Sequence, residues 1–156
     1  MKSIDIPDGV TSIGTSIFQQ CYSLNSVSIP DTVTSLSSSL FHSCYALKSI
    51  DIPDTVTSIA NSIQNCYSLQ EIKIPNSVTR FSGAIFSNCN ALRVINFGNT
   101  RSNVFSQNNI STNIKGEGLR YIVVPDALYD SWKAAWTNFT EFIIKYTDYQ
   151  NLTNNA

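Results

Sequence analysis

The sequence predicts a short right-handed solenoid of the α/β repeat type, in which similar coils of 22 or 23 residues stack along one axis. Three observations predict it: regular prolines, regular cysteines, and apolar residues at matching positions of every repeat. The prolines are Pro7, Pro30, Pro53 and Pro75, and the cysteines are Cys21, Cys44, Cys66 and Cys89. Neighbours within each series lie 22 or 23 residues apart, so each repeated position becomes a column of the stack.

Each repeat is expected to contain a strand, a turn and a short helical piece. Residues 47–53 alternate apolar and polar side chains and end in Pro53, which predicts a half-buried strand closed by proline. Residues 55–58 predict a second extended piece, and residues 37–47 predict a short helical or 3₁₀ segment. The third repeat is one residue short. We align its segment 61–66 as lacking the residue at the Phe41 position, which puts Ile63 in the column of Leu40 and Ile85.

The repeated pattern LxxIxIPxxVTSIxxxxFxxCxxL resembles the BspA-like class of leucine-rich repeats. The resemblance covers residues 1–97 and resumes at residues 119–125, which carry a further strand signature before Pro125. It implies a leucine-rich-repeat coil of about five repeats, with about four coils in residues 1–98. Gly98 stands where the next strand-closing proline after Pro75 is expected.

The remaining boundaries follow from where the period starts and stops. Met1 aligns with Leu47, so the chain is expected to begin inside a repeat and to be a fragment with further repeats, and any export signal, upstream. Residues 99–118 break the period with asparagine and glycine and are expected to form an irregular surface loop. Residues 119–156 should hold the last strand, a C-terminal capping helix and a tail.

The capping helix is predicted from an apolar stripe at helical spacing. Its members are Leu128, Trp132, Ala135, Trp136 and Phe139. Asp126 is the expected N-cap of this helix. The two tryptophans are expected to pack over the last coil, with a carbohydrate-binding platform as the alternative. The segment from Pro125 also resembles the one that follows the last repeat in BspA-like proteins of gut bacteria and their prophages.

The composition excludes several classes of function. Only 13% of residues are charged and the net charge is -1, which excludes a polycation built for nucleic acid. No apolar run is long enough for a membrane-spanning helix. No nucleotide, zinc-protease or nucleophile motif is present and His42 is the single histidine, expected as an exposed polar residue, so we predict no enzyme and no cofactor.

The four cysteines allow three interpretations. Their spacing does not suit zinc, whose ligands come in pairs two to four residues apart. Stacked coils would bring neighbouring cysteines within disulfide distance, so disulfides remain an alternative. Buried free thiols are favoured because free cysteine is among the most buried residue types.

Two surface features are candidates for binding a partner. The first is the outward side of the strands, where charged and polar side chains would form columns that serve as a mixed-charge docking patch. Within it, Asp51 and Lys73 would alternatively neutralise each other as a cross-strand pair. The second is a column of tyrosines, one after each of the first three cysteines, which suits a rigid contact surface or packing between coils. The candidates are Lys48, Asp51, Glu71, Lys73, Arg93, Asn96, Tyr22, Tyr45 and Tyr67.

The resemblance implies a secreted or cell-surface protein that binds other proteins. We therefore expect a non-catalytic adhesion module whose partner is a protein on the host or another cell, without nucleic acid or membrane insertion. One alternative is a structural spacer or stalk that displays another domain. A further alternative, from the C-terminal resemblance, is part of a phage or prophage surface protein.

Overall fold

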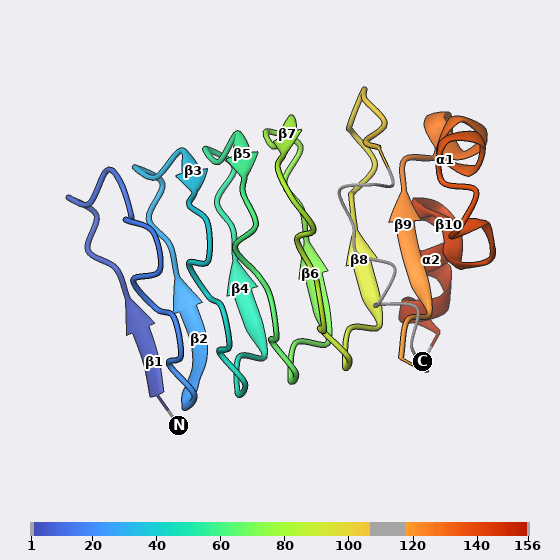
Figure 1. Cartoon of the computed structure of the whole chain (residues 1–156). Coiled ribbons are helices and arrows are strands. Elements are labelled where there is room, and N and C mark those ends of the chain that lie inside the picture. The colour runs from blue at the N-terminus through green and yellow to red at the C-terminus, as the bar shows by residue number, and fades with distance from the viewer. Residues whose placement is uncertain (1, 107–117, 156) are drawn as a thin grey trace.

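The computed structural model describes residues 2–106 and 118–155, and these form a solenoid of about six turns followed by a helical region (Figure 1). One side of the solenoid carries parallel strands that follow one another in sequence order. They are β1 (Lys2–Asp5), β2 (Leu24–Ser28), β4 (Ser49–Asp51), β6 (Glu71–Lys73), β8 (Val94–Asn96), β9 (Tyr121–Val124) and β10 (Ile143–Lys145). A second row of short strands lies at another corner of the coils: β3 (Ser35–Leu36), β5 (Ser58–Ile59) and β7 (Arg80–Phe81).

The strand pairing confirms the predicted repeat solenoid. Val27 pairs with Ile50, and Ile72 pairs with Ile95, so equivalent positions of neighbouring repeats lie side by side. These residues are buried while their neighbours along the strand are mostly exposed, because side chains alternate between the two faces of a strand. The turn count exceeds the expected five because the partial first coil, entered at β1, adds a turn.

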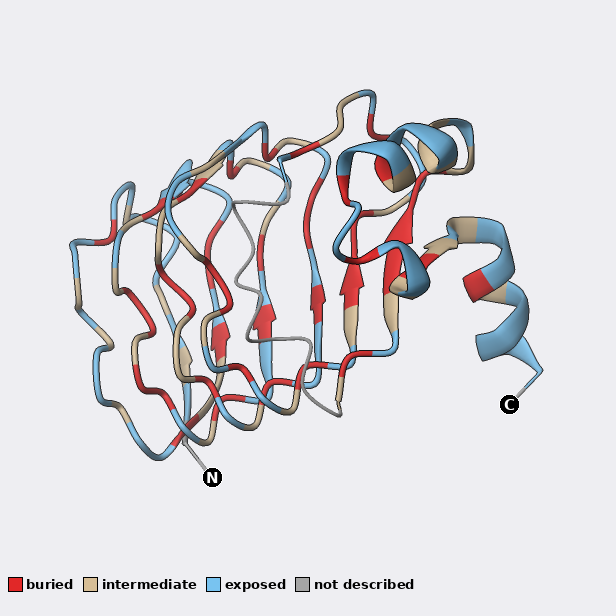
Figure 2. Cartoon of the chain, turned by 45° about the vertical axis from the view of Figure 1, so that its right-hand side comes forward, coloured by how far each residue is buried: buried red, intermediate tan, exposed pale blue. Residues whose placement is uncertain are grey.

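The interior is a single apolar core that runs along the stack (Figure 2). It is built from the columns of leucine, isoleucine, valine and phenylalanine expected from the sequence, and most of these side chains are almost fully buried. Each coil packs only against its neighbours, so stability is spread along the axis as in other repeat proteins.

The segment opposite the strands contains turns and no helix over residues 37–47, so the prediction of a short helix there is wrong. Ser39 and Ser43 have φ angles of 57° and 62°. These left-handed residues stop a right-handed helix from continuing. Backbone hydrogen bonds to the next coil replace the helical ones, as when the Ser43 N–H donates to the Gln64 carbonyl at 2.9 Å.

The position of the missing residue in the third repeat also differs from the alignment. The Phe41 N–H donates to the Ser62 carbonyl, which places Ile63 beside Phe41. The Cys89 thiol donates to the Ile63 carbonyl, as the Cys66 thiol does to Phe41. Ile63 therefore stands in the phenylalanine column, and the leucine position of Leu40 is the one deleted. Alignment by letters missed this because isoleucine fits either column.

The C-terminal region covers the last coil with more structure than predicted. After Pro125 come a 3₁₀ turn (Asp126–Leu128), α1 (Tyr129–Ala135), a second 3₁₀ turn (Thr140–Phe142), β10 and α2 (Tyr146–Asn154). Trp132 and Trp136 are fully buried over the core, as expected for a cap, although α1 ends before Trp136. The expected tail thus contains β10 and α2.

Asp126 does not cap the helix that follows it, so that prediction is wrong. The N-cap position of the 3₁₀ turn is Pro125, and no side chain caps it. The Asp126 carboxylate instead accepts a hydrogen bond from the Thr147 backbone N–H at 3.1 Å. Hydrogen bonds from Thr147 lower the pKa of Asp126. The carboxylate therefore stabilises the first turn of α2. This contact could not be predicted from the sequence, because α2 is not the helix that directly follows Asp126.

Residues 99–106 of the expected surface loop are irregular but contain buried side chains. Arg101 and Phe105 are 4% and 6% exposed. The Arg101 guanidinium donates to the carbonyls of Val78 and Pro75 at 2.6 and 2.5 Å and lies 4.6 Å from the Phe105 ring centre. This segment therefore packs against the coils, and the remaining residues of the predicted loop, 107–117, lie outside the described residues.

Candidate protein-docking surface

The tyrosine column (Tyr22, Tyr45 and Tyr67) lies just before the strands of three successive coils. Neighbouring rings are stacked with their centres 4.9 Å apart. The three residues are 50%, 40% and 44% exposed, so each ring shares a face with its neighbour and presents its edge to solvent. The two interpretations of the tyrosine column, packing between coils and a contact surface, are therefore compatible, because stacking orders the rings without burying them.

A ladder of polar side chains precedes the tyrosine column on the same coils. The imidazole Nδ1 of His42 lies 3.1 Å from the Gln64 side-chain oxygen. The Asn65 amide lies 3.4 Å from the imidazole Nε2, and its oxygen accepts from Asn88 at 2.8 Å. His42 is thus half-buried and hydrogen-bonded, which corrects the expectation of an exposed residue. These bonds connect the coils of Tyr45 and Tyr67 to each other and to the coil that follows.

The five charged residues among the predicted candidates lie on the outward side of the strands, as the sequence predicts. They are Lys48, Asp51, Glu71, Lys73 and Arg93, and all are exposed. Their exposure leaves them available to a partner, but they carry both signs and are spread over three coils. The binding role of these residues remains a prediction.

Asn96 does not belong to this exposed surface, so its assignment as an outward-facing candidate is corrected. It is only 9% exposed, and its side-chain oxygen accepts a hydrogen bond from the Gly98 N–H at 2.9 Å. Its strand partner Val123 is fully buried. Helix α2 covers this part of the strand face, with the Tyr149 ring centre 5.8 Å from that of Tyr121. The cap thus occupies the face that the repeat pattern alone leaves open.

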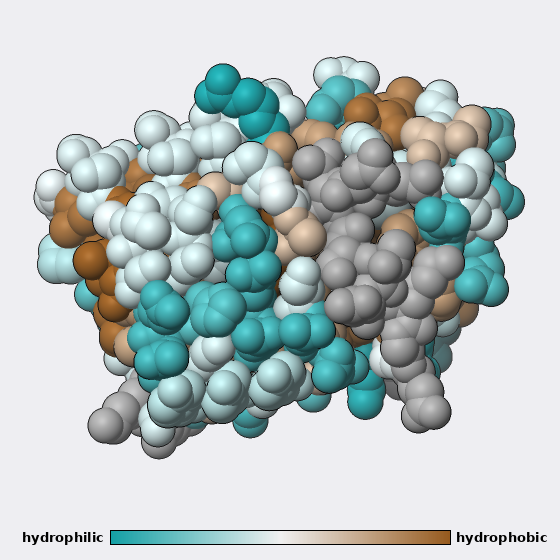
Figure 3. All heavy atoms as spheres, viewed as in Figure 1, coloured by the Kyte–Doolittle hydropathy of each residue, from teal (hydrophilic) through white to brown (hydrophobic). Residues whose placement is uncertain are grey.

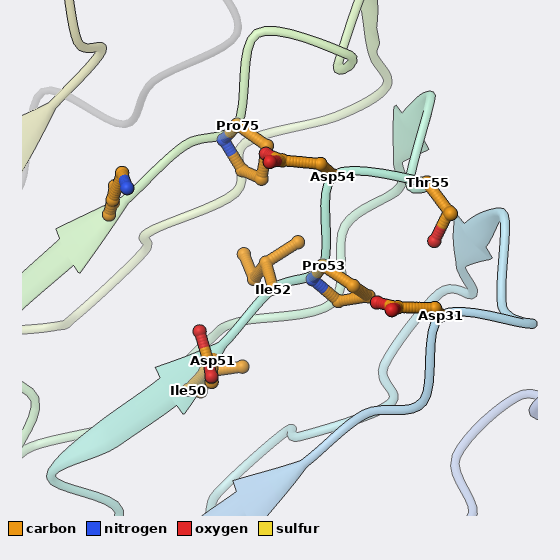
Figure 4. A pocket seen from close by; sticks show the side chains of 9 residues that line it. Asp31, Ile50, Asp51, Ile52, Pro53, Asp54, Thr55 and Pro75 are labelled. Carbon is orange, nitrogen blue, oxygen red and sulfur yellow. The ribbon is translucent and has the colours of Figure 1, made fainter. Parts of the chain in front are cut away.

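Asp51 and Lys73 form no ion pair within the described residues, so the predicted mutual neutralisation is not observed. The parallel ladder is interrupted between their strands, β4 and β6, which belong to separate sheets. The coil between these strands is the one that lacks a residue. An open cleft of about 410 Å³ lies here and is lined by both side chains together with Asp31 and Asp54 (Figure 4).

Sequence reasoning missed Asp31 and Asp54. A signal was available, because the repeated Ile-Pro-Asp places an aspartate after the proline in each of the first three coils. In Figure 4 the side chain of Asp31 extends toward Pro53 of the next coil. That of Asp54 extends toward Pro75 in the same way.

The cysteine column lies in the interior, away from both surface features. The structure agrees with free thiols: Cys44, Cys66 and Cys89 are buried and Cys21 is half-buried. Burial raises the pKa of the Cys44 thiol to about 12.

In the described part of the chain, no three metal-ligating side chains converge on one point. No helix there has the length and apolar character needed to cross a membrane.

Comparisons with known proteins agree with this architecture. The profile of the BspA type leucine-rich repeat region matches residues 1–115 with six copies. A leucine-rich cell surface protein from Faecalibacterium prausnitzii A2-165 is 28% identical with a TM-score of 0.73. A leucine-rich repeat protein from Bacteroides ovatus ATCC 8483 is 25% identical with a TM-score of 0.54. No curated protein matches the chain.

The two crystal structures are of longer proteins. The similarity covers 85% and 81% of this chain, but only 34% and 40% of those two chains. This chain thus spans less than half the length of either. Leucine-rich repeats generally mediate protein interactions, and a protein-interaction module is the coarse assignment that the match supports. With six repeat copies over most of its length and the observed stack of coils, the chain belongs to the BspA-type leucine-rich repeat family.

Proposed function

We propose that this chain is the non-catalytic adhesion module of a secreted or cell-surface protein and binds a protein on a host or another cell. The observation that carries the proposal is the tyrosine column, in which three stacked rings are 40% to 50% exposed. Tyrosine supplies a large contact area and a polar hydroxyl while losing few side-chain rotamers on binding. Stacking reduces that loss further because the rings are already ordered.

The surrounding surface supports docking in preference to catalysis. The neighbouring coils present hydroxyl and amide groups already bonded to one another, and the exposed charges of the strand face flank the column. Aromatic residues in the centre of an interface with a polar rim are the common arrangement of protein-binding surfaces. The Faecalibacterium relative is a cell surface protein, which supports placement of this chain outside the cell.

Attachment of the purified chain to host cells and extracellular matrix tests the proposal. Tyr45→Ala removes the central ring, and we expect it to weaken attachment by roughly 30-fold, the loss of a hot-spot residue worth about 2 kcal/mol. Leu152→Ala, at another exposed hydrophobic residue, is the control and should change nothing. Attachment that survives Tyr45→Ala and alanine at Lys48, Glu71, Lys73 and Arg93 would instead support the spacer function.

A further inference from the structure

The cleft between β4 and β6 is one part of a longer depression on the strand side of the first coils. A neighbouring hollow of about 430 Å³ shares Ile50 and Asp51 with it. Another, of about 300 Å³, shares Asp31, Asp51 and Pro53. We call the whole depression the acidic groove, after the ionisable side chains that line it. These are Asp5, Asp8, Asp31, Asp51, Asp54 and Lys73.

The charges that line the groove are unbalanced. Five carboxylates face a single ammonium group, whereas the whole chain carries a net charge of only -1. Asp51 and Lys73 form no ion pair within the described residues, so the excess negative charge is not neutralised from inside the groove. The carboxylates of the described region do not converge as metal ligands would. They are distributed along several coils and therefore suit an extended ligand with several positive charges better than a single metal ion.

Apolar side chains form part of the floor of the groove. Ile50 and Ile52 line the cleft and are each 7% exposed, whereas Ile72 and Ile74 of the next coil are 1% exposed. A small part of the apolar core is therefore accessible at the cleft. Lysine and arginine side chains suit such a site because their aliphatic stems cover apolar surface while their charged ends remain at carboxylates near the rim.

We propose that the acidic groove binds an extended, lysine- or arginine-rich segment of the partner protein. This inference rests on the proposed function and names the chemistry of one contact. Parallel strands lie ~4.7–4.9 Å apart, so aspartates of successive coils form a row with that spacing. An extended segment places every second side chain on one side, ~6.6–6.8 Å apart, which lets several basic residues reach carboxylates of different coils.

Fluorescence anisotropy with a labelled eight-residue peptide of alternating lysine and serine tests the groove. We expect saturable binding that weakens as salt is added, because exposed charges are screened. Asp31→Asn, Asp51→Asn and Asp54→Asn should each weaken it by up to about fivefold, and together by more than about tenfold. Lys73→Gln should strengthen binding. Circular dichroism melting verifies that each variant is folded.

Matched variants outside the groove make the test specific. Asp130→Asn, Asp148→Asn and Lys145→Gln produce the same charge changes at exposed sites in the C-terminal region and should leave peptide binding unchanged. Equal losses from these variants, or a peptide of alternating glutamate and serine binding as well, would overturn the inference. So would spermine that competes as strongly as the peptide and responds to the same substitutions, since the groove would then bind any polycation.

The outcome is distinguishable from that of the adhesion test. Tyr45→Ala should leave peptide binding unchanged, because the tyrosine column is not part of the groove lining. Tyrosine-dependent attachment without peptide binding would refute the groove alone. Peptide binding without tyrosine-dependent attachment would refute the proposed docking surface alone.

Discussion

Each buried cysteine thiol donates a hydrogen bond to a carbonyl of the preceding coil. The thiols of Cys44 and Cys66 donate to the carbonyls of Phe18 and Phe41 at 3.0 and 3.3 Å. A small polarisable side chain that donates one weak hydrogen bond suits a position facing both the core and a carbonyl. For Cys66, a hydrogen bond with Cys89 and burial both raise the pKa of the thiol.

Thiol reactivity should distinguish these positions. For Cys44 the rise in pKa from 9.0 to about 12 lowers the thiolate fraction about a thousandfold, and only the thiolate attacks a disulfide reagent. In the native protein at mildly alkaline pH we expect one rapidly reacting thiol, the half-buried Cys21. Denaturation without reductant should expose all four cysteines to the reagent. Fewer than four reactive thiols after denaturation would contradict the free-thiol assignment, and Cys21→Ser should remove the fast phase.

Arg101 closes the solenoid interior where the period breaks. Its guanidinium bonds to two backbone carbonyls and to the Asn103 side chain, and it lies over the rings of Phe97 and Phe105. Burial lowers the pKa of Arg101 to about 10, so the group remains charged at neutral pH. Its geometry requires a planar donor with several N–H groups.

Arg101→Lys keeps the charge but loses the planar donor. The lysine ammonium cannot reach both carbonyls in the same way, so we expect the free energy of unfolding to fall by about 1.5–3 kcal/mol, the worth of one charged hydrogen bond. Urea denaturation measures it. The same substitution at exposed Arg120 should have no effect beyond a few tenths of a kcal/mol. Equal stability of the two variants would show that Arg101 is not a structural clamp.

Among the elements, the short third coil departs most from the regular repeat. Deleting the leucine position leaves Ser62 fully buried. Neither its hydroxyl nor the Asn61 side-chain oxygen has a hydrogen-bond partner among the residues that the structure describes. The ladder of β3, β5 and β7 continues across this coil, but the ladder between β4 and β6 does not. The shortened coil therefore loses both core volume and strand pairing.

Restoring the missing residue should strengthen this coil. A leucine inserted between Ser62 and Ile63 returns the coil to 23 residues and places an apolar side chain beside Leu40 and Ile85. A serine inserted at the same place is the matched control. We expect the leucine insertion to be more stable than the serine insertion by about 1.5–3 kcal/mol, the value of burying one such side chain. Equal melting temperatures would mean that the position is not in the core.

Helix α2 depends on a carboxylate from another part of the chain. The pKa of Asp126 is lowered in the folded state, so the interaction stabilises the fold above the ordinary pKa near 3.8 and is lost as pH falls through the lowered value. Asp126→Asn should therefore destabilise the protein at neutral pH by about 0.3–1 kcal/mol. The difference from the unmodified chain should shrink as the pH falls below 3.8 and vanish once the Asp126 carboxylate is protonated in the folded state. Thermal melts across this range measure it, with Asp130→Asn as the control, and a difference that persists in acid would contradict the assignment.

Over the whole molecule, the sequence predicted the repeated apolar columns and missed features that depend on contacts between distant segments. Columns such as Val27, Ile50 and Ile95 could be predicted because every coil repeats the same alternation. The burial of Asn96 could not, because it depends on where α2 folds back over the strands. The tyrosine column and the aspartates after the first three prolines were visible as repeats, although the aspartates were overlooked. The cleft between β4 and β6 was not visible, because the interrupted ladder arises from contacts between coils.

The pairing of the strands predicts a gradient of local stability along the stack. Among the described residues, strand β1 pairs with β2 alone, and Ile17 in the same coil is 60% exposed. Hydrophobic residues gather at this end of the molecule (Figure 3). At the other end, β8 pairs on both sides and lies under the buried Trp132 and Phe97.

Native-state hydrogen exchange should therefore show β1 amides exchanging at least about tenfold faster than those of β8, a difference of about 1.4 kcal/mol in opening free energy. In a one-dimensional array, nearest-neighbour contacts set the cost of opening a coil, so a coil with one neighbour opens first. Leu92→Ala, in the fully buried core beside β8, should reduce protection there while β1 keeps its low value. Uniform protection from β1 to β8 would mean that the stack opens only as a whole, and nearest-neighbour contacts would then not set its stability.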